Sequence, residues 1–162
     1  MKNIFLYLLL CSLSCLTTLA DNVPTDHVFV VERNKNANRV CYDVNLQNGS
    51  LCLKEPLKSY WMGEGWTDGL TFLDRRMAFG VKIFSTEKDK ASVHLTAYKD
   101  LIINICKRGG KWVGIVRLHG HEMVLQKLFA HMKAPLYIRC EYVDVYGIDT
   151  TTGEKRRERI MP

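Results

Sequence analysis

The sequence lacks an apolar run long enough to span a membrane. Its extended apolar stretch, residues 4–16, follows a single cation at Lys2 and is shorter than the roughly 20 residues that a spanning helix needs. Thr18 and Ala20 then place small residues before Asp21, in the pattern that a signal peptidase recognises. We therefore predict a removable secretory signal over residues 1–20, no membrane span, and a periplasmic or secreted product.

A lipid anchor is the alternative for this leader. Cys11 or Cys15 could be acylated after cleavage, but the three residues before Cys15 match a bacterial lipobox poorly. A lipid-anchored product is therefore disfavoured.

Internal repeats and low-complexity linkers are also missing, so nothing in the chain marks a domain boundary. Residues 21–162 have the length of one ordinary domain and are predicted to form a single β-rich unit. The whole chain carries a net charge of +6, to which the leader contributes only Lys2. An exported basic protein could bind an anionic surface polymer, lipid headgroups or a small ligand. Nucleic acid is not expected in that compartment, and the charge could also serve solubility alone.

Catalytic signatures are lacking as well. The chain has no Gly-x-Ser-x-Gly elbow, and none of its cysteines lies in a recognisable catalytic motif. His119-Gly120-His121 resembles the start of a metal site, but zinc needs three or four ligands and the other histidines are scattered. We predict no metal and no cofactor. The sequence leaves open whether the protein is an enzyme and favours a non-catalytic protein.

What the chain does contain is β-strand patterning. From His27 onward, Val, Ile, Tyr and Phe alternate with polar residues, and turn residues recur at short intervals. The predicted strands are residues 28–33, 39–45, 51–53, 57–62, 81–85, 93–98, 101–108, 111–118, 122–131, 136–146 and 154–160. Glycines that suit the positive φ of hairpin turns lie between them, at Gly49, Gly110, Gly120 and Gly153. The pattern predicts a mainly β fold, an antiparallel meander that closes into a barrel or a two-layer sandwich.

One segment departs from this pattern and predicts a helix over residues 70–79. Apolar side chains recur there at helical spacing, at Leu70, Leu73 and Met77. Asp68 can cap the start of this helix, and Gly80 can take the left-handed conformation after its end. Asp74 and Arg75 are expected on its solvated side.

Four cysteines follow the leader, namely Cys41, Cys52, Cys106 and Cys140. An even number in an oxidising compartment permits up to two disulfides, in three possible pairings. If Asn48-Gly49 forms a two-residue turn, Cys52 faces Asn45 and lies too far from Cys41 to bond with it. A wider loop would allow that pair, and buried free thiols are the alternative to any disulfide.

Two stretches contain the candidate ligand-binding residues. Residues 32–39 hold three Asn and four charges between two strands, and residues 60–66 set aromatic side chains beside glycines. Such aromatic groups can stack on a sugar or another planar ligand. The residues predicted to bind ligand are Arg33, Asn36, Asn38, Tyr60, Trp61 and Arg75. The alternatives are a solvated turn for the first stretch and core packing for Tyr60 and Trp61.

These stretches also carry a family resemblance. The segments concerned are residues 28–33, 36–43, 60–61 and 70–81, and the likeness extends to residues 142–147 and 152–153. Together they resemble a family of small exported bacterial proteins, catalogued as domain of unknown function number 4833. The resemblance implies an exported protein from the Bacteroides group and its relatives, and it supplies no reaction, cofactor or catalytic residue.

Three functional hypotheses follow. The first is a non-catalytic binding protein of the bacterial envelope that holds a small ligand or a surface polymer, because a small closed β fold offers an interior or a mouth for ligands. The second is a structural or interaction protein without a small-molecule site. The third is an envelope hydrolase, which needs a histidine or carboxylate beside a nucleophile or a bound metal.

Overall fold

Thirteen strands and one short helical segment follow one another in the computed structural model, which describes residues 27–161. The strands are β1 (Phe29–Arg33), β2 (Asn36–Val44), β3 (Leu46–Gln47), β4 (Ser50–Leu51), β5 (Leu57–Gly63), β6 (Trp66–Gly69), β7 (Val81–Glu87), β8 (Lys90–Leu95), β9 (Tyr98–Arg108), β10 (Lys111–Leu118), β11 (His121–Met132), β12 (Cys140–Asp149) and β13 (Lys155–Ile160). The helical segment comprises α1 (Phe72–Asp74) and the π-helical turn η1 (Arg75–Phe79). The mainly β prediction with one helix is confirmed, whereas the predicted leader lies outside the described residues.

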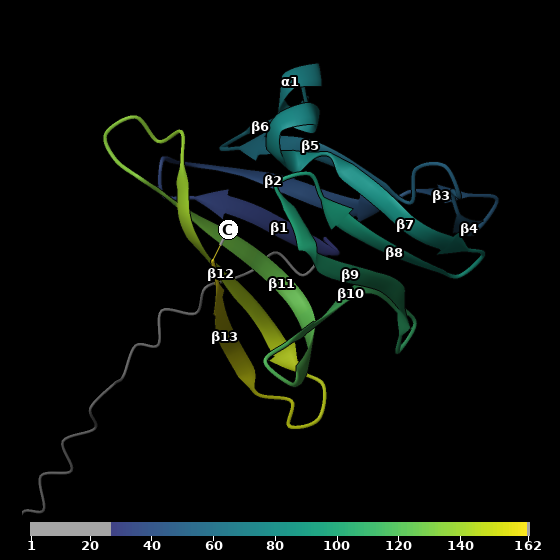
Figure 1. Cartoon of the computed structure of the whole chain (residues 1–162). Helices are drawn as coiled ribbons and strands as arrows, with labels where there is room; N and C mark the ends of the chain where they lie inside the picture. Colours follow the sequence, from purple (N-terminus) through teal and green to yellow (C-terminus); the bar gives the residue numbers. More distant parts are fainter. Residues whose placement is uncertain (1–26, 162) are drawn as a thin grey trace, which may run out of the picture.

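Most strands belong to one sheet that curls strongly into a half-barrel (Figure 1). Its order is β6-β5-β2-β1-β11-β10-β9-β8-β7, and β12 and β13 extend it from β11. The small β3-β4 hairpin forms a separate sheet. Neighbouring strands run antiparallel except β1 and β11, which pair in parallel. That pairing joins distant parts of the chain and is not anticipated by a meander of sequential hairpins.

Strand β11 is the branch point of the sheet. Strand β12 pairs with it from Met123 to Met132 and so occupies one of its edges. On the other edge, β10 pairs with residues 121–125 and β1 pairs with residues 127–130. The register with β12 shifts between Leu125 and Lys127, and such a bulge bends a strand. The two wings that leave β11, β1-β2-β5-β6 and β10-β9-β8-β7, therefore curl toward each other.

The hydrophobic core fills the space between the wings. Phe29 stacks on Tyr42 with ring centroids 4.4 Å apart. A Cβ added to Gly114 of β10 would lie 3.0 Å from Ile103 and 3.6 Å from Phe29, so the two wings are in close contact there. The largest fully buried side chains come from both wings and from β11, and they include Tyr42, Phe29, Leu57, Leu95, Ile103, Ile105, Met123, Leu125 and Leu128.

The helix begins and ends differently from the prediction. It starts after Thr71 rather than after Asp68, because Thr71 and Asp74 form a reciprocal capping box. Gly80 is extended, with φ −63° and ψ 142°, rather than left-handed. Its N–H donates to the carbonyl of Arg75 at 3.1 Å and closes the wide π turn.

The predicted apolar stripe is also wrong, because the π turn changes the spacing of the side chains. Leu70 and Phe79 are buried, but Leu73 and Met77 are 66% and 71% exposed, and Phe72 is 73% exposed. A π turn takes in an additional residue, so the regular helical spacing that linked Leu70, Leu73 and Met77 is lost. Three large apolar side chains consequently face outward. None of the helices in residues 27–161 has the length and apolar character to cross a membrane.

Other boundaries also differ. The strand predicted from residue 136 begins at Cys140, and Tyr137 has φ +54°, a left-handed conformation that an extended strand does not adopt.

The hairpin at Asn48-Gly49 is confirmed, because Gln47 pairs with Ser50 and both turn residues have positive φ. All four cysteines between residues 27 and 161 are free thiols, and the N–H of Cys52 donates to Asn45 as this turn requires.

Candidate functional site

The helical segment lies over the mouth of the half-barrel, against the wing that contains β5 and β2 (Figure 1). Trp61 of β5 pairs with Val40 of β2, so both side chains face the core. The indole packs edge-on against Phe79, with ring centroids 5.1 Å apart. Tyr42 donates its hydroxyl hydrogen to the carbonyl of Phe79 at 2.8 Å. The end of the helical segment is thereby fixed to the inner face of the sheet.

The side chain of Arg33, the last residue of β1, lies beside Trp61 and Phe79. Its guanidinium carbon lies 5.0 Å from the ring centre of Trp61 and 5.3 Å from that of Phe79, which is the geometry of a cation–π contact with both rings. The Nε of Arg33 is buried and has no hydrogen-bond partner among the described residues. Burial lowers the pKa of Arg33, while the negative charge of Asp74 acts in the opposite direction. The guanidinium keeps its positive charge, as arginine does in proteins.

Asp74 holds the indole in position. Trp61 Nε1 donates to Asp74 Oδ2 at 3.1 Å, and the backbone N–H and hydroxyl of Thr71 donate to the same oxygen at 3.0 and 2.8 Å. Burial alone would raise the pKa of Asp74, but these hydrogen bonds and the charge of Arg33 outweigh it and hold the pKa below its ordinary value. Asp74 is therefore ionised at neutral pH and orients Trp61. We call Arg33, Trp61, Asp74 and Phe79 the Arg33 cluster.

Tyr60, a predicted site residue, lies on the opposite face of the sheet. Successive side chains of a strand alternate, so Tyr60 faces away from the cluster that Trp61 joins. Its hydroxyl donates to Asp43 Oδ2 at 2.7 Å, and His27 Nδ1 lies 2.7 Å from the other oxygen of Asp43. Burial and the hydrogen bond to Asp43 hold the pKa of Tyr60 well above its usual range. The prediction that Tyr60 and Trp61 act together is not supported by this arrangement.

The two predicted asparagines do not hydrogen-bond to the Arg33 cluster either. Asn36 is exposed and pairs with Arg33 in the β1–β2 ladder, and Asn38 lies where the register of that ladder shifts. Within the described part of the chain, neither amide side chain makes a hydrogen bond.

Arg75 follows Asp74 but turns toward a different part of the surface. Its Nε donates to the carbonyl of Leu70 at 3.3 Å, and its Nη1 lies 3.6 Å from Glu55 Oε1. The guanidinium borders an open hollow of about 540 Å³. We call this the basic hollow, and its lining residues are Phe72, Arg75, Arg76, Gly80, Val81 and Lys82. Of the six predicted residues, the structure thus brings Arg33 and Trp61 together, whereas Arg75 contacts Leu70 and Glu55 instead.

Sequence reasoning missed Asp74 and Phe79. Asp74 was expected on the solvated side of the helix, yet it accepts a hydrogen bond from Trp61. The signal for it was present, because Thr71-Phe72-Leu73-Asp74 has the spacing of a capping box. No local pattern links Phe79 to Arg33, since that contact depends on how the π turn rotates the end of the helix.

In the described part of the chain, no histidine is paired with a nucleophile in the way that the hydrolase hypothesis requires. Four of the five imidazoles contact carboxylates, in the pairs His27–Asp43, His119–Glu158, His121–Asp149 and His131–Asp144. The fifth, His94, lies 3.1 Å from the carbonyl of Leu95. In residues 27–161, no hydroxyl or thiol hydrogen-bonds to an imidazole, and no three His, Cys, Asp or Glu side chains gather as metal ligands would.

Comparison with known proteins gives a family. The family model described as "Domain of unknown function (DUF4833)" matches residues 29–159. The chain belongs to the DUF4833 family. The resemblance predicted from the sequence is confirmed, and the matched DUF4833 region contains both the Arg33 cluster and the basic hollow. No curated protein and no solved structure matches the chain.

Proposed function

We propose that this DUF4833 protein is a non-catalytic binding protein of the bacterial envelope, and that it holds an anionic group of a small ligand or surface polymer against Arg33. The observation that carries the proposal is the state of the Arg33 guanidinium. It lies against the rings of Trp61 and Phe79, which pack on each other, and no carboxylate of the described residues lies within ion-pair distance of it.

A guanidinium suits this role chemically. It offers five N–H donors in a planar fork, and two of them can bond in parallel to a carboxylate, sulfate or phosphate. At Arg33 none of these donors is engaged by a hydrogen bond within residues 27–161. Because the group is partly removed from water, its attraction to an anion is stronger than that of a fully solvated cation.

The aromatic contacts favour binding in a second way. Arginine loses rotamer freedom when it binds a ligand, and that loss weakens binding. Trp61 and Phe79 restrict the guanidinium beforehand, and the hydrogen bond from Trp61 to Asp74 restricts Trp61 in turn. Asp74 is a positioning residue in this proposal, because it acts on the ligand through Trp61. The predicted signal over residues 1–20 supports the placement in the envelope.

The test begins with the ligand that the protein acquires in the cell. Native mass spectrometry of protein purified from the exporting cell should show a bound small molecule or oligomer. Calorimetric titration with glucuronate, glucose 6-phosphate and sulfate then probes the anion, with glucose as the neutral control. We expect Arg33→Gln to weaken binding of the preferred anion at least about tenfold. Arg33→Lys should retain part of the affinity, because lysine keeps the charge and loses the fork.

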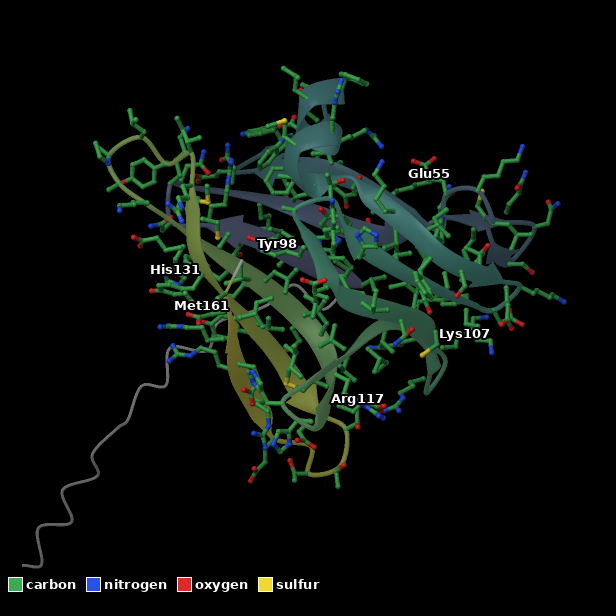
Figure 2. All side chains as sticks on the ribbon, in the orientation of Figure 1. Glu55, Tyr98, Lys107, Arg117, His131 and Met161 are labelled. Carbon is green, nitrogen blue, oxygen red and sulfur yellow. The ribbon has the colours of Figure 1, made fainter. Side chains whose placement is uncertain are left out.

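Arg117→Gln is the matched control. Arg117 lies on β10, its side chain is 76% exposed, and Figure 2 shows it far from the helical segment. It should bind as the unmodified protein does. Equal affinity of the Arg33→Gln and Arg117→Gln proteins, or a preference for glucose over every anion, would contradict the proposal.

A further inference from the structure

Three of the exposed side chains of the helical segment are large and apolar. Phe72, Leu73 and Met77 are 73%, 66% and 71% exposed. Leu73 is in α1 and Met77 is in η1, so both belong to the same short segment as Phe72. We call these three residues the helix tip. Figure 1 shows that the helical segment projects beyond the strands, so the helix tip is a convex apolar surface rather than a groove.

Basic side chains lie beside this apolar surface. Arg76 places its guanidinium carbon 6.0 Å from the ring centre of Phe72. Arg75, Arg76 and Lys82 line the basic hollow together with Phe72, and no Asp or Glu belongs to that lining. Among the described residues, the ion pair made by these cations is that of Arg75 with Glu55, at 3.6 Å, and the two side chains are 46% and 57% exposed. An exposed pair of this kind is weak and is readily replaced by another anion.

Large apolar side chains flanked by cations are the pattern of a surface that lies in the membrane interface. The apolar groups enter the boundary between headgroups and acyl chains, and the cations bind the lipid phosphates. A convex tip fits this role, because a bilayer can admit a projection without a complementary groove. We infer that the helix tip docks on an anionic lipid surface, with Phe72, Leu73 and Met77 in the interface and Arg76 and Lys82 against phosphate groups. This docking does not require an anion at Arg33.

The test measures cosedimentation of the purified protein with vesicles of phosphatidylglycerol and phosphatidylcholine, and with vesicles of phosphatidylcholine alone. Binding should be strong only with the anionic vesicles. We expect Met77→Ser and Leu73→Ser each to weaken partitioning roughly tenfold, because each removes a large apolar side chain from the interface. Arg76→Gln and Lys82→Gln should each weaken it roughly fivefold, and added salt should reduce that difference.

Met161→Ser and Arg117→Gln are the matched controls. Met161 is 73% exposed and Met77 is 71% exposed, and Figure 2 shows both control residues well away from the helical segment. Every variant carries the same N-terminal segment, so a difference between variants reports on the substituted side chain alone. Soluble glycerol phosphate distinguishes the sources of phosphate, because it should compete weakly if a lipid surface is the partner.

Three results would overturn the inference. The first is equal binding of the unmodified protein to neutral and anionic vesicles. The second is equal partitioning of the Met77→Ser and Met161→Ser proteins. The third is a dimer in light scattering that Leu73→Ser converts to a monomer, which would assign the helix tip to a second copy of the chain. Loss of anion binding in the Arg33→Gln protein with unchanged vesicle binding would leave the docking intact and test the Arg33 site separately.

Discussion

Replacing Asp74 with alanine should destabilise the fold and release Trp61. Asp74 accepts hydrogen bonds from Thr71 and Trp61 at 2.8–3.1 Å. Loss of a helix cap costs about 1 kcal/mol, and leaving a partly buried indole N–H without its charged acceptor costs about 1–3 kcal/mol. The sum of about 2–4 kcal/mol corresponds to a fall in Tm of roughly 8–15 °C for a domain of this size.

Thermal unfolding followed by circular dichroism measures the stability. Tryptophan fluorescence reports on Trp61 when the other two tryptophans, Trp66 and Trp112, are replaced by Phe in every variant. Asp68→Ala is the matched control, because Asp68 accepts one exposed hydrogen bond from the N–H of Gly69. Its stability should stay within about 0.5 kcal/mol of the unmodified protein. The proposed role of Asp74 is refuted if Asp74→Ala unfolds at the same temperature as Asp68→Ala.

The pH dependence of the same substitution gives a second test. The pKa of Asp74 is lowered in the folded protein, so its carboxylate stabilises the fold above the unfolded pKa of about 3.9. That contribution is lost as the pH falls through the lower folded pKa. Asp74→Asn removes the charge and keeps the shape, so the difference in unfolding free energy from the unmodified protein should be full near pH 6 and shrink below about pH 4. A difference that stays constant down to about pH 2.5 would contradict this assignment.

Two further predictions concern the sheet. A Cβ at Gly147 would lie 2.6 Å from the carbonyl oxygen of Val124, so Gly147→Ala should cost about 1–3 kcal/mol in urea unfolding. Gly69→Ala, where a Cβ meets nothing within 4 Å, should change little, and equal losses at both positions would contradict the packing. Burial, with a smaller effect of nearby carboxylates, raises the pKa of Cys41 to about 11. Alkylation of the folded protein at about pH 8 should therefore label Cys41 far more slowly than the partly exposed Cys52, and equal rates by mass spectrometry would count against this.

Local signals predicted the fold where the structure is decided locally. Alternation and turn glycines located most of the strands, and the bounds of β10 match the predicted 111–118. The Asn48-Gly49 turn determined the register of its hairpin, because a two-residue turn permits only one pairing of the flanking residues. The start of β12 was misplaced because apolar residues in an exposed loop have the same alternation as a half-buried strand. Leu136 and Ile138 of that loop are 72% and 80% exposed.

The site was predicted residue by residue and not as an arrangement. Arg33 and Trp61 stood out by their side-chain chemistry, but their contact depends on two registers. Val31 pairs with Val40, and Val40 pairs with Trp61 across β2. Arg33 is two residues beyond Val31 and therefore shares its face. The separation of 28 residues between Arg33 and Trp61 does not predict either register. The parallel pairing of β1 with β11 depends on the packing of the whole core.

The anchoring of the helical segment explains how one short element can serve both proposed sites. In its middle, Thr96 Oγ1 donates to the carbonyl of Arg75 at 3.1 Å, and at its end Tyr42 donates to the carbonyl of Phe79 at 2.8 Å. At its start, Asp74 holds the segment to Trp61. A helix of this length is not stable by itself, so these contacts determine its position. Because Asp74 both caps the helix and orients the indole beside Arg33, a force that displaced the helix tip would also disturb the Arg33 cluster. A lipid surface that restrains the tip should therefore restrain Trp61 as well.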